Sequence, residues 1–403
     1  MKENRKGDIF MSLVNTPSGN RLHIGIFGKR NSGKSSLLNA ITGQEIALVS
    51  EVKGTTTDPV SKAMEIHPIG PCLLIDTAGF DDTGDLGNMR IEKTKAVLDK
   101  TDVAVVVFSD MQMELETQWI AMLRQRKIPI LAVVNQVDRI EQAQEIKRQI
   151  EQRFSLTPLL VSAKEKTGIS QMKHEILRLM PPDFEAQSLT GSLVQPEDVV
   201  LLVMPQDKQA PKGRLILPQV QTIRDLLDNH CVVMCVTTEQ LSTALQALAK
   251  PPKLIITDSQ AFAQVYPLKP AETLLTSFSI LLAAYKGDLS AFVKGANALD
   301  SLTDDSHVLI AEACTHAPLQ EDIGRVKIPN MLRKKYGEHL QVTVVSGSQF
   351  PKDLSEYQLI IHCGACMFNR KHVLTRVEQA VPITNYGVVL AKLTGILDRI
   401  SMQ

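Results

Sequence analysis

Residues 28–36 read GKRNSGKSS and match the phosphate-loop pattern G-x-x-x-x-G-K-[ST]. The apolar run LHIGIF (22–27) precedes this loop, and the helix-like run SSLLNAIT (35–42) overlaps its end. A strand, a glycine-rich turn and a helix in this order surround a phosphate with backbone N–H groups at the positive end of the helix. We expect Lys34 to reach the β- and γ-phosphates and the Ser35 hydroxyl to ligate magnesium. The candidate nucleotide contacts are Gly28, Lys29, Arg30, Asn31, Ser32, Gly33, Lys34, Ser35 and Ser36.

Apolar and polar stretches alternate on both sides of this loop. Five apolar runs, each followed by a polar, helix-like segment, read RLHIGIF, CLLIDTAG, VAVVVFSD, PILAVVNQ and TPLLVSAK. Alternation of this kind is typical of βαβ units, which build a mostly parallel sheet covered by helices on both faces. A turn-rich segment begins at Pro181, so the sequence predicts a first α/β domain over residues 1–182.

The rest of the chain predicts two further α/β domains, because 403 residues exceed one typical core. The strand and helix pattern resumes at DVVLLVMP without a nucleotide motif, which predicts a smaller middle domain over residues 190–270. We expect Cys231 and Cys235, in and beside its strand CVVMCVT, to be core thiols. A third domain over residues 271–403 opens with TLLTSFSILLAAY (273–285), which we expect to be a buried helix.

Four further motifs follow the phosphate loop in the order that a guanine-nucleotide switch requires. A hydroxyl of Thr55-Thr56-Thr57 can sense magnesium and the γ-phosphate. DTAG (76–79) offers a carboxylate to magnesium and a backbone N–H to the γ-phosphate. The Asp of NQVD (135–138) can accept the two N–H groups that distinguish guanine from adenine, and SAK (162–164) can support the base. These motifs add Thr55, Thr56, Asp76, Thr77, Ala78, Gly79, Asn135, Asp138, Ser162, Ala163 and Lys164 to the predicted nucleotide site. Within it, magnesium is assigned to Ser35, Thr56 and Asp76, and catalysis to Lys34, Thr56 and Gly79.

This set of motifs resembles the translation-factor-related GTPases, in particular the tRNA-modification GTPase and the ribosome-assembly GTPases with a GTT switch. Gln136 stands where that family usually has a Lys that packs over the purine, so we expect modest affinity. Phe80 follows DTAG where related switches have a water-orienting Gln nearby, so we expect slow intrinsic hydrolysis. Asn31 is similar to the Asn of potassium-activated relatives and is a candidate potassium ligand; a loop-capping role is equally open.

Cysteine and histidine side chains gather in two short segments near the carboxyl end. Cys314 and His316 follow the strand-like run HVLIAEA, and His362-Cys363-Gly364-Ala365-Cys366 follows YQLII. We expect Gly364 to let the backbone turn tightly between two metal-binding thiolates. Three interpretations stay open from the residues: buried free thiols, a zinc site completed by a histidine, and a 4Fe-4S cluster on three cysteines. The predicted cluster ligands are Cys314, Cys363 and Cys366, with His316, His362 and Glu321 as candidates for the fourth position or for support.

The phrases EACTH, DIGRVKIP and IIHCGACM resemble the maturation GTPase family of iron-iron hydrogenases, known as HydF. The resemblance implies a scaffold that hydrolyses GTP and whose carboxyl-terminal α/β domain binds a 4Fe-4S cluster. It also implies that the protein binds a diiron precursor, which two radical-SAM maturases build, and delivers it to apo-hydrogenase. The resemblance further implies that the middle domain forms a homodimer. The chain lacks the C-x-x-x-C-x-x-C motif of a radical-SAM enzyme.

Charge and hydropathy limit the classes of binding partner and the cellular location that we expect. Lys plus Arg equal Asp plus Glu, 44 against 44, which makes nucleic acid and anionic lipid unfavourable partners. The amino-terminal residues lack a secretory pattern, so we expect a cytoplasmic protein without a membrane partner. Two alternatives remain at this point: an RNA-directed GTPase of the tRNA-modification or ribosome-assembly type with a structural zinc site, and a regulatory switch whose metal only stabilises the fold.

Overall fold

The computed structural model describes residues 16–43, 60–77, 96–181, 184, 188–205, 215–313, 322–347 and 349–402. The chain divides into two compact units, Met1–Glu185 and Ala186–Gln403. No helix within the described ranges combines the length and the apolar character needed to cross a bilayer.

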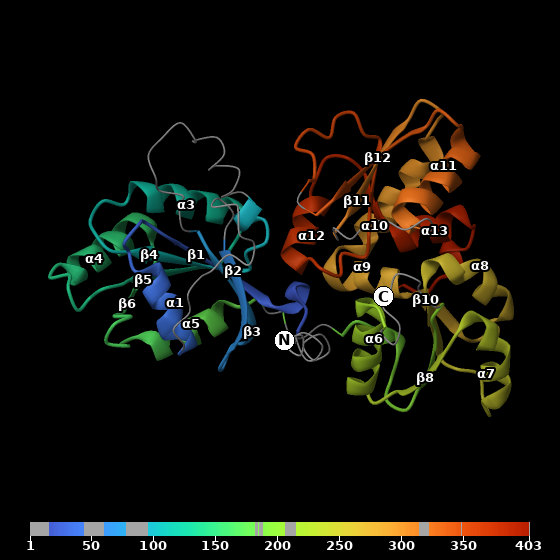
Figure 1. Ribbon diagram of the computed structural model, residues 1–403, viewed down its shortest axis with the longest axis horizontal. Coiled ribbons are helices and arrows are strands. Elements are labelled where there is room, and N and C mark those ends of the chain that lie inside the picture. Colours follow the sequence, from blue (N-terminus) through green and yellow to red (C-terminus); the bar gives the residue numbers. More distant parts are fainter. Residues whose placement is uncertain are drawn as a thin grey trace, which may run out of the picture. The chain divides into compact units, whose positions relative to one another are not determined.

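The first unit is built on a six-stranded sheet of order β2-β3-β1-β4-β5-β6, in which only β2 runs antiparallel to its neighbour (Figure 1). This confirms the predicted, mostly parallel sheet, and β2 is an edge strand that the sequence pattern did not indicate. The strands are β1 Leu22–Gly28, β2 Val60–Ile66, β3 Gly70–Asp76, β4 Val103–Phe108, β5 Ile130–Val134 and β6 Leu159–Leu160. The helices are α1 Lys34–Thr42, α3 Glu114–Gln125, α4 Ala143–Phe154 and α5 Ile169–Leu179.

Helices cover both faces of this sheet because strand side chains alternate between the faces. In β4, Val103, Val105 and Val107 pack in the apolar cluster that contains α1 and α5. Ala104 and Val106 pack in the opposite cluster, which contains α3 and α4. Burial on both faces explains why these strands read as continuous apolar runs.

The second unit contains two four-stranded sheets, both fully parallel, of order β10-β9-β7-β8 and β12-β11-β13-β14. One apolar cluster joins them, since it includes Leu201 and Ile255 of the first sheet and Ile310 and Ile360 of the second. The first sheet comprises β7 Val199–Val203, β8 Val232–Val236, β9 Leu254–Thr257 and β10 Leu274–Ser277, with α6 Leu217–Asp228, α7 Leu241–Ala247 and α8 Phe262–Val265. The second comprises β11 His307–Glu312, β12 Gln341–Ser346, β13 Leu359–His362 and β14 Ile383–Asn385. The remaining helices are α9 Phe278–Lys286, α10 Leu289–Ala296, α11 Ile328–Tyr336, α12 Arg370–Val377 and α13 Tyr386–Leu393.

The helix expected over residues 273–285 begins only at Phe278. Residues 274–277 form β10 and pair with β9 in the first sheet of this unit. Ser277 then caps α9, because its side chain accepts the N–H of Ile280. Pairing with a neighbouring strand and a serine cap therefore outweigh the helical pattern of this stretch.

Cys235 is exposed, which contradicts its assignment as a core thiol, whereas Cys231 is buried as expected. Cys235 lies in β8, an edge strand of its sheet, where Val232 is also 57% exposed. An edge strand lacks the cover that a central strand receives, and its apolar composition alone does not distinguish the two positions.

Candidate functional site

The phosphate loop lies between the end of β1 at Gly28 and the start of α1 at Lys34. Asn31 (φ 63°) and Gly33 (φ 81°) both adopt the left-handed conformation that turns the chain back on itself. The Lys34 side chain is buried, and its ammonium donates to the carbonyls of Gly28 and, at 2.7 Å, Lys29. Ser35 and Ser36 are exposed at the start of α1. The loop therefore has the strand-turn-helix geometry that binds a phosphate chain.

Asn135 ties the phosphate loop to the two segments that follow β5 and β6. Its Nδ2 donates to the carbonyls of Ser32 (3.0 Å) and Gly33 (3.3 Å), and its Oδ1 accepts the N–H of Ala163 (3.3 Å). Gln136, the departure from the GTPase pattern, donates from Nε2 to the carbonyl of Asn31 at 2.9 Å. Gln136 thus adds a further side-chain hydrogen bond to the phosphate loop, beside those of Asn135.

Asp138 is held as a charged acceptor. The Ser162 hydroxyl donates to its Oδ1 at 2.6 Å, and this bond lowers the pKa of the Asp138 carboxyl below its usual range. Ser162 itself is fixed because its hydroxyl accepts the N–H of Glu165 at 3.0 Å. The structure thus brings together Asn135, Asp138, Ser162 and Ala163, as the motifs predict for a guanine-binding corner.

A charged cluster beside the phosphate loop was not predicted. The Lys29 ammonium lies 2.8 Å from Asp110 Oδ1 and 3.6 Å from Glu116 Oε2, and it also donates to the Gln112 carbonyl. Glu116 is 1% exposed, and burial raises the pKa of its carboxyl to about 7. No sequence motif indicates Glu116, because Glu116 and Lys29 are distant in the sequence and become neighbours only when the chain folds.

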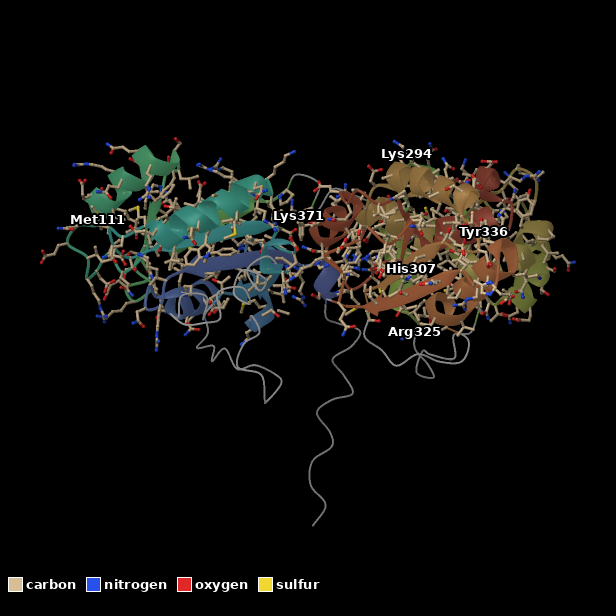
Figure 2. All side chains as sticks on the ribbon, turned by 90° about the horizontal axis from the view of Figure 1, so that it is seen from above. Met111, Lys294, His307, Arg325, Tyr336 and Lys371 are labelled. Atoms are coloured by element: carbon tan, nitrogen blue, oxygen red, sulfur yellow. The ribbon has the colours of Figure 1, made fainter. Side chains whose placement is uncertain are left out.

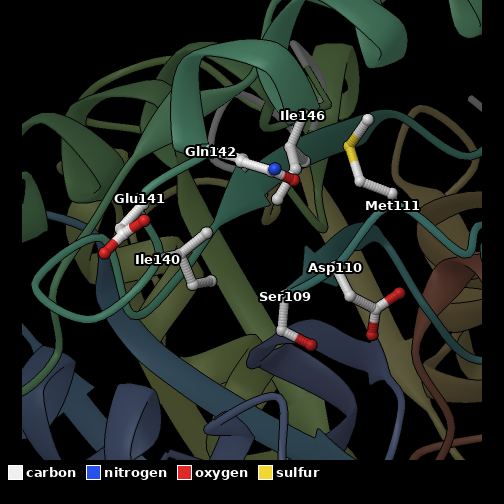
Figure 3. A pocket seen from close by; sticks show the side chains of 7 residues that line it. All are labelled: Ser109, Asp110, Met111, Ile140, Glu141, Gln142 and Ile146. Carbon is white, nitrogen blue, oxygen red and sulfur yellow. The ribbon is translucent and has the colours of Figure 1, made fainter.

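A depression of about 340 Å³, largely open to solvent, shares Asp110 with this cluster (Figure 3). Asp110, which pairs with Lys29, stands on one wall, and Ile140 stands across from it. Its lining is Ser109, Asp110, Met111, Ile140, Glu141, Gln142 and Ile146.

Two of the DTAG residues lie within the described chain. Asp76 ends β3 and is 3% exposed. Thr77 ties this end to β1, because its N–H (3.3 Å) and its hydroxyl (2.7 Å) both donate to the Ile26 carbonyl. The predicted residues Thr55, Thr56, Ala78 and Gly79 lie outside the described residues, and their roles stay predictions.

In the second unit, β11 and β13 are parallel neighbours with Ala311 opposite His362, so both strands end at one edge. Cys363 follows directly, and its N–H donates to the Ala311 carbonyl at 3.0 Å. Its sulfur accepts two backbone N–H groups, from Ala313 at 3.1 Å and from Ala365 at 3.4 Å. Burial raises the pKa of the Cys363 thiol to about 11, and the two amides act in the opposite direction.

The turn between Cys363 and Cys366 is made by Ala365, not by Gly364 as the sequence suggested. Ala365 has φ 52°, a conformation that side-chain-bearing residues rarely adopt. A Cβ on Gly364 would meet only ordinary contacts, Leu282 at 3.5 Å and a serine hydroxyl at 3.9 Å. The glycine is therefore not required for the shape of this loop.

His362 is 1% exposed, and both of its ring nitrogens contact the protein. Nε2 lies 2.9 Å from Nη1 of Arg376, and Nδ1 lies 2.9 Å from the Cys363 carbonyl. Because Arg only donates, Nε2 must accept and Nδ1–H must donate. Burial, with the charge of Arg376, lowers the pKa of His362 to about 3, so the ring is neutral.

Glu312, the last residue of β11, is a buried carboxylate at the same edge. It accepts from Arg325 Nε and from the Ser346 hydroxyl, each at 3.2 Å, and from the Tyr386 hydroxyl at 3.4 Å. Arg325 is labelled in Figure 2. Glu312 is thus fully engaged within the protein.

Across the described ranges, no three His, Cys, Asp or Glu side chains converge as a metal site. The third cysteine of the predicted set, Cys314, and the candidates His316 and Glu321 lie outside the described residues. Cys363 and Cys366 lie within them, as thiols that form no disulfide.

Two family models match the second unit. Residues 189–287 match the hydrogen maturase F dimerization domain, and residues 290–402 match the hydrogen maturase F tetramerization domain. The chain belongs to the hydrogen maturase F family. The two matched ranges meet just after α9, and the domain boundary at residue 270 stays a prediction from the sequence. No motif of the chain had indicated a tetramerization domain.

The first unit carries a GTPase domain, as predicted, because residues 23–136 match a model described as 50S ribosome-binding GTPase. GTPase Der of Wolinella succinogenes is 33% identical over 172 residues, which cover 39% of this chain and 36% of that protein. The tRNA modification GTPase MnmE of Bordetella petrii is 38% identical over 162 residues, which cover 39% and 33%. This member of the hydrogen maturase F family thus spans about a third of the length of these relatives.

Two solved structures are similar to parts of the chain. A probable GTP-binding protein engB is 23% identical and covers 39% of this chain and 97% of its own, with a TM-score of 0.32. Aquifex aeolicus Era Y63A bound to GDP·AlF4⁻ is 18% identical and covers 62% and 99%, with a TM-score of 0.35.

Proposed function

We propose that this protein hydrolyses GTP and carries a 4Fe-4S cluster together with a diiron precursor, which it delivers to apo iron-iron hydrogenase. Membership of the hydrogen maturase F family supports a role in the maturation of hydrogenase. The sulfur of Cys363 carries the proposal within the chain, because two backbone N–H groups point at it where β11 and β13 end. Backbone donors aimed at one sulfur stabilise the negative charge that a metal-bound thiolate retains.

The donor set fits a cluster held by three thiolates, Cys314, Cys363 and Cys366. Ala313 donates to Cys363, and it directly precedes Cys314 in the sequence, which supports the inclusion of Cys314 in the proposed ligand set. We propose His316 or Glu321 ahead of His362 for the fourth position, since both ring nitrogens of His362 are engaged. When bound, a 4Fe-4S cluster with an exchangeable iron position supplies a point at which a diiron fragment can dock.

The GTPase unit supplies the nucleotide chemistry of the proposal. Lys34 neutralises the β- and γ-phosphates, while Ser35 and Asp76 hold magnesium together with Thr56. Asp138 selects guanine, and its bond from Ser162 keeps it ready to accept. We further propose slow hydrolysis stimulated by potassium at Asn31, whose carbonyl is anchored by Gln136.

The proposed partners are a second copy of this chain, two radical-SAM maturases and apo iron-iron hydrogenase. The dimerization and tetramerization domains of the family support self-association. We propose a cytoplasmic location because the described cysteines are thiols and not disulfides, and the cluster needs reduced ligands. The balanced charge disfavours nucleic acid and membrane partners.

The test is anaerobic reconstitution with iron and sulfide. We expect about four iron atoms per chain in the wild type, with the visible absorption and reduced EPR signal of a cubane cluster. Cys314→Ala, Cys363→Ala and Cys366→Ala should each lose iron, while Cys72→Ala, Cys231→Ala and Cys235→Ala should keep it. A colourless protein that binds zinc would instead favour the RNA-directed GTPase with a structural zinc site. Full iron content in Cys363→Ala would contradict the proposed ligand set.

A further inference from the structure

Lys286 is the last residue of α9, and it is 1% exposed. Its ammonium donates to the carbonyls of Phe368 (2.8 Å), Cys366 (3.0 Å) and Ala365 (3.3 Å). An ammonium has three N–H groups, so three donors match three acceptors. All three acceptors belong to the segment that begins with Cys363, which we call the cysteine loop (residues 363–368).

The cysteine loop needs such a partner because of its own geometry. Ala365 is held in the left-handed conformation, which a residue with a Cβ does not favour. Its carbonyl accepts the N–H of Phe368 at 3.0 Å as well as the Lys286 ammonium. The Lys286 ammonium thus donates hydrogen bonds to three backbone carbonyls of the cysteine loop, which stabilises the turn.

Further hydrogen bonds connect α9 with the residues around the cysteine loop. Arg370, at the start of α12, donates to the carbonyls of Tyr285 (3.1 Å) and Gly287 (3.0 Å) at the end of α9. Asn385 donates to the Cys363 carbonyl at 3.4 Å and accepts from Ser279 of α9 at 3.0 Å. α9 belongs to the dimerization segment and the loop to the tetramerization segment, so these ties join the two domains.

The charge of Lys286 also calls for a negative partner. A buried ammonium is costly unless an opposite charge compensates it. The Lys286 ammonium instead contacts three carbonyls of the cysteine loop, one of which belongs to Cys366, a proposed cluster ligand. Metal-bound thiolates would supply the missing negative charge.

We infer that Lys286 is a positioning residue of the cysteine loop, which it holds in a ligating shape while placing a positive charge beside the cluster. This inference rests on the proposed function for its second half only. A positive charge near a cluster favours the reduced form, which carries the extra electron. Lys286 therefore makes the loop rigid before metal binds and raises the reduction potential afterwards.

The test compares Lys286→Met with Lys269→Met in the full chain. Lys269 is a matched control, because its ammonium also donates to three carbonyls, of Pro270 (2.8 Å), Ala271 (3.2 Å) and Thr273 (2.6 Å). In metal-free protein, we expect amide hydrogen exchange in the cysteine loop to rise about tenfold or more in Lys286→Met, and to stay unchanged in Lys269→Met. After reconstitution, Lys286→Met should retain less iron and show a more negative reduction potential.

A second variant covers the case in which Lys286→Met does not fold. Lys286→Gln keeps an N–H donor and removes the charge, so we expect a smaller rise in exchange and a reduction potential below that of the wild type. Exchange within twofold of the wild type in the folded variants would overturn the loop-holding role, and an unchanged potential would overturn the electrostatic role. A wild type that takes up no cluster would defeat the proposed function, and the exchange data would still decide whether Lys286 holds the loop.

Discussion

Replacing Gly33 with Ala tests how the phosphate loop depends on one backbone conformation. Gly33 has φ 81°, and a Cβ placed there would lie 2.4 Å from Nδ2 of Asn135. Two non-bonded heavy atoms do not approach each other this closely in a folded protein, so Asn135 has to move. Its displacement breaks the bonds to the carbonyls of Ser32 and Gly33 and the bond from Ala163.

The size of the effect follows from these contacts. Forcing a Cβ-bearing residue into the left-handed region costs about 1–2 kcal/mol. Losing the two or three hydrogen bonds of Asn135 costs about 1 kcal/mol each. Bound nucleotide has to restore the loop, so a total of about 3–5 kcal/mol appears as a loss of GTP affinity of more than about a hundredfold.

The assay is a titration of the metal-free protein with GTP and magnesium by calorimetry. Gly43→Ala is the matched control: Gly43 also has a positive φ, 69°, but a Cβ added there would meet no described atom within 4 Å. It should lose about 1 kcal/mol of stability and no GTP affinity. GTP affinity within threefold of the wild type in Gly33→Ala, or an equal loss in Gly43→Ala, would show that nucleotide binding does not depend on the backbone conformation of Gly33.

Four further predictions concern other residues. Asp138→Ala should reduce the preference for GTP over ATP by about 10- to 100-fold in competition binding, because it removes the paired acceptor for guanine; an unchanged ratio would show that the base is read elsewhere. Asn31→Ala should equalise GTP turnover in potassium and sodium, and equal turnover in the wild type would remove the potassium site. Glu116 has a folded-state pKa of about 7 against 4.5 for the free side chain, so the folded state binds more protons between these values and stability falls as pH rises through that window. Glu116→Gln should therefore gain about 2 kcal/mol relative to the wild type between pH 5 and pH 8 in chemical denaturation, and a parallel pH profile would contradict this. Ala365→Gly should raise the stability of the second unit by about 1 kcal/mol by relieving its positive φ, and a loss in thermal unfolding would count against that strain.

The sequence predicted those features that local chemistry determines. The phosphate loop, the alternation of strands and helices and the proximity of Asn135, Asp138 and Ser162 follow from short motifs whose spacing is set by one turn or one strand end. The same holds for the cysteine pair after β13, because two thiols three residues apart lie in one loop.

Features that depend on contacts between residues far apart in the sequence could not be predicted from local motifs. Lys286 and Cys366 are 80 positions apart in the chain, and only folding brings the ammonium to the cysteine loop. The exposure of Cys235 depends on β8 being an edge strand, and the start of α9 depends on β9 pairing with residues 274–277. Ala365 makes the turn that the sequence predicts at Gly364, because the surrounding contacts, not intrinsic preference, decide which residue turns the chain.

Delivery of the diiron precursor is tested most directly by hydrogen evolution from apo iron-iron hydrogenase. The protein is purified without oxygen after co-production with the two radical-SAM maturases and is then mixed with the apo-enzyme. We expect wild-type protein to activate the hydrogenase and Cys363→Ala protein to leave it inactive. A hydrogenase that stays inactive with wild-type protein carrying its full iron content would show that this chain does not deliver the precursor.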